Sequence, residues 1–476
     1  MYRAYVTRVT NIRPAENADR LNACEVFGNT TIIDKSITED DTIVYFPSDG
    51  QISVEFGEKN NLFRRKDDAG NNVGGFIDPV KRNITAIRLR GNRSDGLVLP
   101  LSCLNYCYAH GDASIELRVG DVIDGVVNGH DICQKYIPRT NKSARMSGGN
   151  KTRKHKTPVA PLFAEHADTE QLAYNLGAFK PGDEIEITLK MHGTSQRTGY
   201  LPTLKGYKRT LLDRILRREG TPVYDWGYVS GTRRVVLENY EGGFYGDNQF
   251  REKHSKVFEG KLNKGETVYY EVVGFTSTGA PIMGDANNKK LNDKEFIKQY
   301  GEITRFSYGC EPEASTTWKL DEDGNDMTLI GRTKQSDIYV YRMTMTNEDG
   351  FVVEYTPDFM RYRCEQMGVK TVPVFYKDFL PKQPYGDASE EQKEMGYLSS
   401  GPISHGEYVK NIAEQFYDGP DPIGKTHVRE GVVVRIVNRP KFCAYKHKCF
   451  AFKCLEGLVK AEAEAPDMEE AQEVVE

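Results

Sequence analysis

The chain has 476 residues, of which 38% are hydrophobic and 28% are charged, and its formal net charge is −5. This length predicts two or three domains, and the composition is that of a globular protein rather than a disordered one. No apolar run is long enough to span a bilayer and the N-terminus lacks a signal-peptide pattern, so we expect a cytoplasmic protein with no membrane partner, whether a cell or a virus encodes it.

Residues 1–137 are predicted to be all-β. Short alternating runs at Thr42–Phe46, Ile84–Leu89 and Gly96–Leu99 are separated by Gly, Asn, Asp and Pro. An OB-type β-barrel is the natural candidate at this size, and such a barrel offers a surface for nucleic-acid strands. The segment Ile12–Leu21 resembles the opening of tRNA-binding OB domains, although the same residues would also suit a tight turn.

Residues 138–157 are predicted to form a basic linker. From Lys135 to Lys156 the chain carries eight basic residues and no acidic one, among Ser, Gly and Asn. A solvated hinge and an electrostatic arm for a phosphate backbone explain this composition equally well. The segment 461–476 is the reverse, acidic without a basic residue, and is predicted to be a disordered tail.

Residues 158–460 are predicted to form a domain of mixed helices and strands. The expected helical pieces are Leu172–Leu176 and Lys294–Gln299, and the expected strands are Glu184–Lys190, Thr267–Val273, Ile338–Met343 and Gly431–Val437. The nine cysteines are scattered without C-x-x-C spacing, which is typical of reduced, buried cysteines rather than of zinc or redox sites.

The strand Glu184–Lys190 carries the most informative pattern. Its apolar residues alternate with polar ones, which places Lys190 at the end of the strand on its polar face. Gly193 follows in a predicted turn, where a missing side chain lets the backbone approach a ligand closely. Taken alone, Lys190 would most often be a solvated lysine at the end of a strand.

The stretch Lys190-Met191-His192-Gly193-Thr194 resembles the nucleotidyltransferase motif of the covalent ligase and capping-enzyme superfamily, in the form typical of RNA ligases. Five later segments resemble further motifs of that superfamily, in the expected order and on predicted strands or their ends: Gly231–Arg234, Tyr269–Gly274, Ile338–Arg342, Glu430–Arg435 and Tyr445–Lys448. The pair Tyr341-Arg342 departs from the Phe-Asp of many relatives. Any one match could be chance, but the ordered series indicates this superfamily.

The resemblance implies a role for each matching residue. Lys190 is the expected nucleophile, and Lys446 and Lys448 are the expected catalytic lysines at the α-phosphate, where Lys453 competes with them by spacing. The implied cofactors are ATP with Mg²⁺ or Mn²⁺, and the metal ligands are Glu430 and Glu271. The implied nucleotide-binding residues are His192, Gly193, Arg233, Glu271, Tyr341, Glu430 and Lys453.

Residues of these types suit phosphoryl transfer. A site crowded with cations disfavours the ammonium form of a lysine and neutralises charge on the α-phosphate and the leaving pyrophosphate. Magnesium prefers oxygen ligands, so a carboxylate such as that of Glu430 is its expected partner. An aromatic ring such as that of Tyr341 provides a flat apolar surface for a base.

The order of the segments resembles the Deinococcus-type RNA ligases. Only Cys449–Glu476 follow the last motif, which is too short for another barrel, and Tyr45–Gly50 and Arg90–Leu97 resemble segments of that family's N-terminal domain. The resemblance implies an α+β protein in which an N-terminal OB-type β-barrel precedes an ATP-grasp-like nucleotidyltransferase domain. It also implies sealing of 3′-OH/5′-phosphate nicks, with RNA on the 3′-OH side, as in RNA repair.

Other functions stay open at this point. A DNA ligase or an mRNA-capping-type guanylyltransferase would share the nucleotide motifs. Comparing ATP with GTP as label donors, and all-DNA with RNA-containing nicks as acceptors, would separate these functions. A tRNA-binding OB protein with an inactive nucleotidyltransferase domain is the alternative from the binding class. For the RNA ligase that the resemblance implies, the expected partner is RNA or an RNA-containing nicked duplex.

Overall fold

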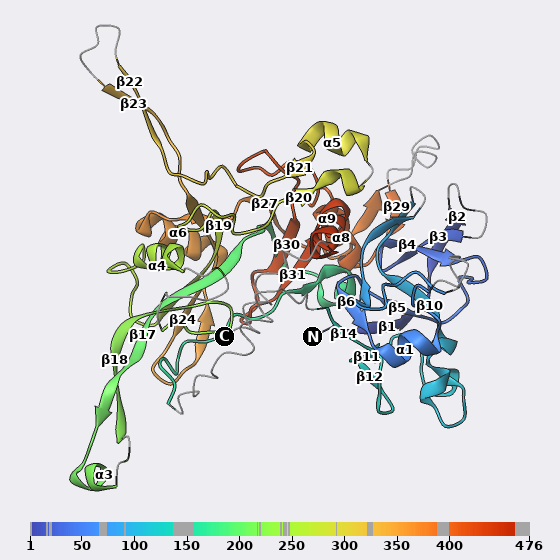
Figure 1. Cartoon of the computed structure of the whole chain (residues 1–476), viewed down its shortest axis with the longest axis horizontal. Helices are drawn as coiled ribbons and strands as arrows, with labels where there is room; N and C mark the ends of the chain where they lie inside the picture. Colours follow the sequence, from blue (N-terminus) through green and yellow to red (C-terminus); the bar gives the residue numbers. More distant parts are fainter. Residues whose placement is uncertain are drawn as a thin grey trace. The chain divides into compact units, whose positions relative to one another are not determined.

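The computed structural model is described for most of the chain (Figure 1). The described residues are 2–15, 18, 21–65, 74–89, 92–136, 157–216, 218, 220–238, 240, 245, 248–291, 293–320, 327–387 and 399–461. The predicted basic linker up to residue 156, the acidic tail from residue 462, and residues 16, 17, 19 and 20 of the segment Ile12–Leu21 lie outside them. None of the described helices is both long enough and apolar enough to cross a bilayer.

The chain forms two compact units, each taken by itself. The first is built from the described residues of Met1–Pro138, Lys290–Asn292 and Phe450–Ala461. The second is built from those of Arg139–Lys289 and Asp293–Cys449. The last helix therefore belongs to the N-terminal unit, although the sequence analysis placed residues 158–460 in one domain.

The first unit is made of short strands around one apolar core. Phe46, Phe56 and Leu104 lie at its fully buried centre. Its elements are β1 Ala4–Thr7, β2 Thr10–Pro14, β3 Leu21–Val26, β4 Asn29–Asp34, β5 Ile43–Phe46, β6 Gly50–Ile52, α1 Val54–Lys59, β7 Asn83–Ile84, β8 Ile87–Leu89, β9 Asn92–Ser94, β10 Leu97–Pro100, η1 Leu101–Cys107, η2 Ala113–Ile115, β11 Val122–Ile123, β12 Val126–Val127, β13 His130–Asp131, β14 Cys133–Lys135 and α9 Phe450–Ala461.

The predicted barrel is not confirmed. The described strands pair into several small sheets, of which the largest has the order β10-β5-β1-β11, and among these residues no closed barrel forms. The all-β character is as predicted, and Thr42–Phe46 and Gly96–Leu99 correspond to β5 and β10. The run Ile84–Leu89 is wrong as one strand, because the chain leaves β7 after Ile84 and pairs again only in β8.

The second unit contains two larger sheets with helices. Its elements are β15 Glu170–Gln171, η3 Leu172–Tyr174, η4 Leu176–Ala178, β16 Glu184–Lys190, β17 Thr194–Lys208, α3 Leu211–Ile215, β18 Thr221–Gly231, α4 Gln249–Lys256, β19 Glu266–Gly274, β20 Ala286–Asn287, η5 Asn288–Leu291, α5 Lys294–Tyr300, β21 Ile303–Thr304, β22 Thr316–Leu320, β23 Met327–Arg332, β24 Ser336–Thr346, β25 Val352–Glu354, α6 Pro357–Met367, β26 Lys370–Thr371, β27 Val374–Phe379, β28 Tyr385–Asp387, β29 Ser399–Pro402, α8 His405–Glu414, β30 Gly431–Ile436 and β31 Ala444–Lys448. Mixed helices and strands were predicted here. The segment Leu172–Leu176 forms 3₁₀ turns rather than an α-helix.

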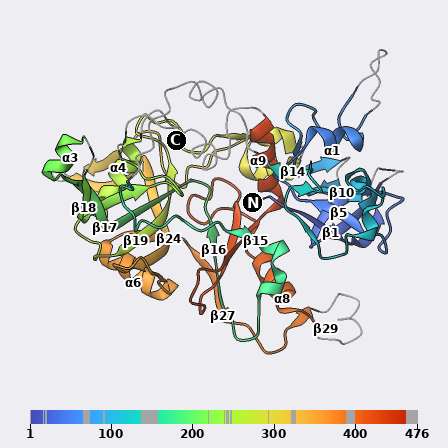
Figure 2. The same cartoon turned by 90° about the horizontal axis from the view of Figure 1, so that it is seen from below.

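The first of these sheets has the strand order β15-β31-β30-β16-β27. Because side chains alternate along a strand, Ile185 and Ile187 of β16 and Val432 of β30 point to the same apolar core. Val409 and Ile412 of α8 pack in this core. Figure 2 shows α8 beside this sheet. The opposite face of the same strands is polar and carries Lys190.

The second sheet has the order β18-β17-β19-β24-β25, with β26 added in parallel to β24. Its central strand β19 is buried along its whole length. Polar contacts join the two sheets: Arg361 of α6 pairs with Glu186 of β16 at 2.8 Å, and Arg435 of β30 donates to the carbonyl of Tyr355 at 3.0 Å. These contacts hold the polar face of the first sheet against the second.

Candidate active site

Strand register brings two predicted lysines to one carboxylate. Lys190, the last residue of β16, pairs with Gly431, the first residue of β30, and Gly431 pairs with Lys448, the last residue of β31. Glu430 directly precedes β30, between the two lysines. Its Oε1 lies 2.7 Å from Lys190 Nζ and 3.3 Å from Lys448 Nζ.

The carboxylate at this centre is deeply buried. The side chain of Glu430 is 2% exposed, compared with 7% for Lys448 and 22% for Lys190. A buried carboxylate is costly unless it is paired, and the two ammonium groups supply that pairing on one oxygen. Oε2 is also buried, yet it makes no hydrogen bond to any described residue, and His192 Nδ1 lies 3.8 Å from it.

This free oxygen fits a divalent cation. Magnesium and manganese bind carboxylate oxygens and complete their shells with water and phosphate oxygens rather than with a full protein cage. Among the described residues, no group of three or more His, Cys, Asp or Glu side chains is placed to hold a metal ion. Glu430, which the sequence predicts as a metal ligand, therefore has an oxygen suited to that role.

The turn after Lys190 is held close to the second sheet. The amide of His192 donates to the hydroxyl of Tyr308 at 2.7 Å, and its ring meets that of Phe306 edge-on at 4.7 Å. A Cβ atom at Gly193 would lie 2.5 Å from the carbonyl oxygen of Val272 in β19. Only glycine allows this approach of the turn to strand β19, and the approach to a ligand that the sequence predicts for Gly193 stays a prediction.

Glu271 lies in the centre of β19, opposite Ser195 of β17 and Tyr339 of β24. Burial raises the pKa of its carboxyl to about 8, and this effect outweighs the charge of Lys190, which lowers it, while Glu430 raises it further. The carboxyl is therefore mostly protonated at neutral pH. A protonated carboxyl can donate a hydrogen bond to a hydroxyl group.

Tyr341 sits in a β-bulge. Tyr269 of β19 pairs with Arg342 and Tyr270 pairs with Val340, so Tyr341 has no residue opposite it. Bulges re-aim side chains, and here the Tyr341 hydroxyl lies 2.8 Å from Ser195 Oγ. Tyr341 of β24 therefore reaches across β19, the strand that carries Glu271, to Ser195 of β17.

Arg233 lies in the turn that follows β18. Its Nη1 is 3.2 Å from Asp168 Oδ1, and Nη2 of Arg234 is 3.0 Å from the other oxygen of the same carboxylate. The charge of Arg233 is near enough to Glu271 to lower that residue's pKa in part. The arginine motif therefore reaches the same region as Glu271.

The remaining two predicted lysines differ in position. Lys446 lies in β31 two residues before Lys448, so both side chains point to the same face of the sheet. Lys453 lies in α9 of the first unit, where it pairs with Asp95 and lies 3.4 Å from Asn29 Oδ1. The structure thus groups Lys190, Lys448 and Glu430, and gives Lys453 a different set of partners.

Sequence reasoning missed several residues around this site. Tyr308 and Phe306 come from a stretch in which no motif was recognised, and both rings contact the fully buried His427, at 4.6 and 5.3 Å. His166 lies 5.3 Å from the ring of Tyr341, ring centre to ring centre. Isolated aromatic residues and histidines gave no spacing signal that could have found them.

The protonation of His166 follows from its neighbours. Burial, reinforced by Arg342, holds the pKa of His166 well below its usual range, so the ring is neutral. Nδ1 lies 3.0 Å from Arg342 Nη1, which can only donate, so Nδ1 accepts and the proton is on Nε2. A neutral ring of fixed tautomer thus packs against Tyr341.

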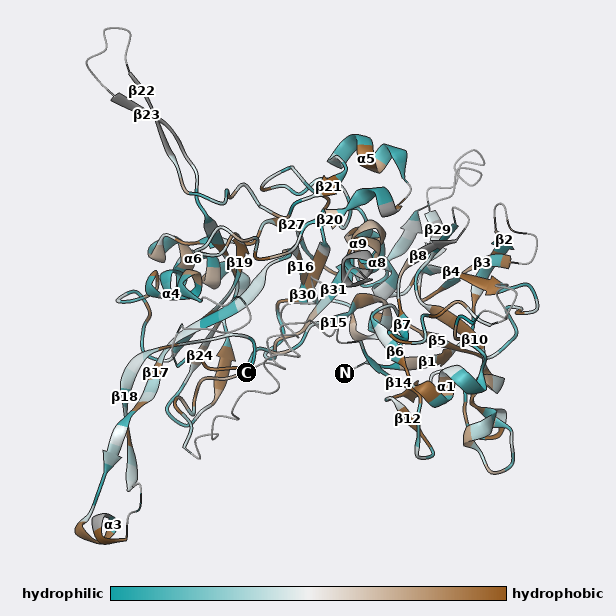
Figure 3. Ribbon diagram, in the orientation of Figure 1, coloured by the Kyte–Doolittle hydropathy of each residue, from teal (hydrophilic) through white to brown (hydrophobic). Residues whose placement is uncertain are grey.

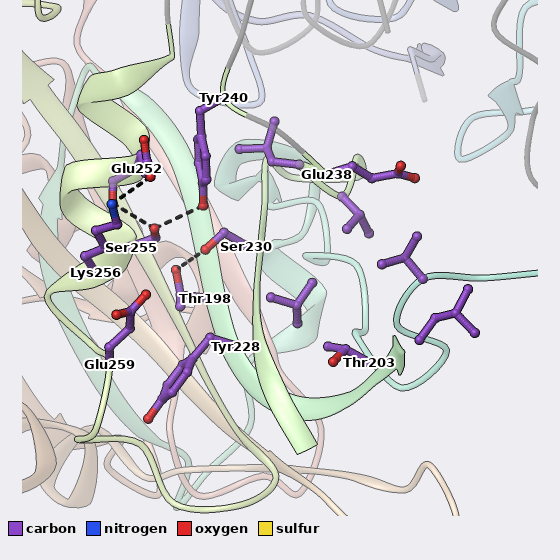
Figure 4. A pocket seen from close by; sticks show the side chains of 15 residues that line it. Thr198, Thr203, Tyr228, Ser230, Glu238, Tyr240, Glu252, Ser255, Lys256 and Glu259 are labelled. Carbon is purple, nitrogen blue, oxygen red and sulfur yellow. Dashed lines mark hydrogen bonds and ion pairs between the residues drawn. The ribbon is translucent and has the colours of Figure 1, made fainter. Parts of the chain in front are cut away.

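A separate cavity of about 490 Å³ lies on the same unit (Figure 4). Its polar side chains are paired with one another: Tyr240 with Ser255 at 3.0 Å, and Thr198 with Ser230 at 2.9 Å. None of the predicted site residues lines it. Thr198 also contacts the hydroxyl of Tyr270, whose side chain points away from the face that carries Glu271.

Comparison with known proteins finds similarity in structure alone. No protein-family model matches the chain, and no curated protein matches it in sequence. Solved structures of a Naegleria gruberi RNA ligase do match. A variant with ATP and manganese has a TM-score of 0.51 at 16% identity, covering 94% of this chain and 98% of the other. The ligase with pyrophosphate has a TM-score of 0.52 at 17% identity, covering 94% and 97%.

An apo variant of the same ligase gives a TM-score of 0.52 at 17% identity over 94% of this chain and 96% of the other. The match spans nearly the full length of both proteins. At this identity it establishes the fold, which is that of the Naegleria RNA ligase structures. The α+β architecture predicted from the sequence is confirmed at that level.

Proposed function

We propose that this protein is an ATP-dependent RNA ligase that seals 3′-OH and 5′-phosphate ends through a lysyl-AMP intermediate on Lys190. The convergence of Lys190 and Lys448 on the buried carboxylate of Glu430 carries the proposal. The shared fold supports it, because the structures of the Naegleria enzyme include complexes with ATP, AMP and pyrophosphate.

The surrounding residues suit ATP. Lys448 and Lys446 would face the phosphates, which replace Glu430 as the partner of positive charge. Glu271, protonated in the ligand-free state, would donate to a ribose hydroxyl. Tyr341 would provide the aromatic surface for adenine, and Arg233 would add positive charge near Glu271.

Glu430 is the residue that would hold a divalent cation. Glu271 would join it only after losing the proton that its raised pKa favours, because a carboxyl must be ionised to bind a metal. The unpartnered Oε2 of Glu430 is the observation that supports this assignment. Such a cation, Mg²⁺ or Mn²⁺, would supply positive charge that neutralises the phosphate oxygens during phosphoryl transfer.

In the first step the Nζ of Lys190 attacks the α-phosphorus of ATP. A P–N bond forms, the bond from the α-phosphorus to the bridging oxygen breaks, and pyrophosphate leaves with that oxygen. The ion pair between Lys190 and Glu430 must open for this attack, so that Nζ can reach the α-phosphorus as an unprotonated amine. The ammonium group of Lys448, which lies 3.3 Å from Glu430 Oε1, can then remain paired with that carboxylate.

Two transfers complete sealing. A 5′-phosphate oxygen attacks the AMP phosphorus, the P–N bond breaks, and Lys190 regains its amine. The neighbouring 3′-OH then attacks the activated 5′-phosphate, its proton is lost, and AMP leaves as the phosphodiester forms. The second and third steps use the same cationic groups, because each again places negative charge on a phosphoryl centre.

We extend the proposal to the Deinococcus-type preference, RNA on the 3′-OH side of a nick. The order along the chain supports it, because residues 1–137 precede every nucleotide motif. The N-terminal unit would bind RNA for sealing, and adenylation would not require it.

A sealing assay tests the proposed function. Nicked duplexes with RNA or DNA at the 3′-OH side are incubated with ATP or GTP and a divalent cation. The proposal expects sealed product with ATP and with RNA at the 3′-OH. Equal sealing of an all-DNA nick would favour a DNA ligase, and label transfer from GTP alone would favour a capping-type enzyme.

A further inference from the structure

The hairpin β17–β18 ends in a short helix whose apolar side chains lie in solvent. In α3 and the residue after it, Leu211 is 77% exposed, Leu212 68%, Ile215 74% and Leu216 54%. Figure 3 shows the brown, hydrophobic α3 at the far end of a largely pale ribbon. Four adjacent exposed aliphatic side chains form a patch that a solitary domain normally avoids.

The tip is a formed structure held by local hydrogen bonds. Asp213 accepts from the amide of Thr210 at 2.9 Å and from its hydroxyl at 2.6 Å, while the amide of Asp213 donates back to Thr210 Oγ1 at 3.2 Å. The amide of Leu216 donates to the carbonyl of Leu212 at 2.9 Å. The helix therefore presents its aliphatic residues side by side without a core to bury them.

A two-stranded ribbon carries this tip away from the sheet. Strand β17 pairs with β19 only as far as Gly199, while its pairing with β18 continues to Lys208. The amide of Leu204 donates to the carbonyl of Val159 at 2.8 Å, and the hydroxyl of Tyr224 donates to that of Pro158 at 3.0 Å, so the body supports the ribbon this far. The four residues beyond Leu204 add a reach of roughly 13 Å at about 3.3 Å each, which exceeds the screening length of about 8 Å at physiological salt.

The tip is locally basic. Between Tyr200 and Tyr228 the sequence has six basic and three acidic residues. Lys208, Arg209 and Arg218 flank the helix and are exposed. Behind them, Tyr224 and Trp226 are half-buried on the ribbon. This order matches the layers of an anionic bilayer surface. The aliphatic residues at the end would meet the acyl chains, the basic residues the anionic headgroups, and the aromatic residues the interface with water.

We propose that the tip formed by α3 and Leu216 docks on an anionic membrane surface. An RNA strand would satisfy the basic residues but leave the aliphatic side chains in water. A hydrophobic groove in another protein usually binds apolar side chains that are spread over two or more turns of one helix. Helix α3 is too short to supply them. This departs from the expectation of no membrane partner, which rested on the lack of a spanning segment; an interfacial tip needs none.

Vesicle co-sedimentation of the full chain tests the proposal. With vesicles containing about 30% phosphatidylserine in phosphatidylcholine we expect binding that weakens as salt rises, and little binding to phosphatidylcholine alone. The double variant Leu212→Ser/Ile215→Ser should lose at least about tenfold in partitioning, because it removes exposed aliphatic surface without touching a core. Lys208→Gln with Arg218→Gln should lose the preference for anionic vesicles.

Matched controls remove similar groups elsewhere on the same unit. Phe351→Ser deletes an apolar side chain that is 70% exposed, and Lys294→Gln deletes an exposed cation on α5; neither should change partitioning. Lys–AMP formation reports folding in every variant and is independent of vesicle binding. Wild-type protein that ignores anionic vesicles, a double variant that binds as tightly as wild type, or loss of RNA binding alone in the tip variants would overturn the proposal.

Discussion

At the scale of single residues, the candidate site depends on one carboxylate shared by two lysines. Glu430 Oε1 balances Lys190 and Lys448, while Oε2 makes no hydrogen bond among the described residues. Without a nucleotide, the group carries more positive than negative charge around a buried centre. Such a centre favours an anion, which is what a triphosphate supplies.

Glu430→Gln should abolish most lysyl-AMP formation. The amide keeps the size of the side chain but removes the negative charge, so we expect a loss of about 100-fold or more in the adenylation rate. Glu414→Gln is the matched control, because Glu414 pairs with His447 and Lys410 on the opposite face of the same sheet. A Glu430→Gln enzyme that adenylates at the wild-type rate would contradict the site.

Glu271 should make the stability of the ligand-free protein depend on pH. Its pKa is raised to about 8 in the folded state, so the folded protein holds a proton that the unfolded chain, near the ordinary value of 4.5, releases. This stability is present in full below the unfolded pKa and is lost as pH rises toward 8, by up to about 1.4 kcal/mol for each pH unit.

Thermal unfolding of wild type and Glu271→Gln between pH 5 and 8 measures this effect. The melting temperature of the wild type should fall more steeply with pH than that of the variant, whose amide does not titrate. Parallel curves for the two proteins would show that the buried carboxyl is not protonated as described.

Much of the site's residue list could be predicted, because its members lie at strand ends in a fixed order. Lys190, Glu430 and Lys448 are separated widely in sequence, yet each borders a strand whose alternation is visible. Tyr308 and His166 could not be predicted, because each contributes a single contact from an irregular segment. Spacing along the chain carries no information about such contacts.

At the scale of elements, the junction between Glu430 and β30 requires glycine. Gly431 has φ +149°, and a Cβ there would lie 2.1 Å from the carbonyl oxygen of His447 in β31. The strands β30 and β31 therefore meet closely enough to bring Lys448 to Glu430. Any side chain at this position would push these two strands apart.

Gly431→Ala should lower both the melting temperature and the rate of adenylation. Backbone strain of this kind costs about 1–3 kcal/mol, and the clash with β31 adds to it. Gly419→Ala is the control that introduces backbone strain without a clash. Gly419 has φ +102°, and no atom beyond its chain neighbours lies within 4 Å of the position that its Cβ would take. Equal effects of the two substitutions on adenylation would mean that the strand junction does not position Lys448.

Strand positions were predictable wherever one face is apolar. The predicted strand Glu184–Lys190 coincides with β16 because its alternation is regular. The bulge at Tyr341 and the break between β7 and β8 were not predictable, since both depend on the register with partner strands rather than on local pattern. Strand pairing is likewise not visible in a local pattern, so short strands alone could not decide between a closed barrel and the several small sheets of the first unit.

At the scale of the whole molecule, helix α9 follows the last nucleotide motif along the chain, yet it packs in the N-terminal unit. It starts two residues after Lys448 but belongs to the N-terminal unit, where Lys453 pairs with Asp95 and Arg93 lies 5.0 Å above the ring of Phe450. The chain order of motifs concealed this, because a contact between residues 95 and 453 leaves no local signature.

A fragment of residues 158–449 should therefore be soluble and still form lysyl-AMP, because it ends before α9. A fragment of residues 158–461 should aggregate, since it keeps the buried Phe452 and Leu455 without the unit to which they belong. Size-exclusion chromatography and AMP labelling of both fragments measure this. A folded 158–449 fragment without labelling would assign the first unit a role in adenylation.

The most direct test of the central claim is to map the AMP adduct. The full chain is incubated with α-labelled ATP and Mg²⁺ or Mn²⁺, digested, and sequenced by mass spectrometry, beside Lys190→Ala and the control Lys377→Ala in β27 of the same sheet. We predict one acid-labile phosphoramidate on Lys190, retained in Lys377→Ala and absent from Lys190→Ala. Label on another residue, or label that persists in Lys190→Ala, would contradict the account.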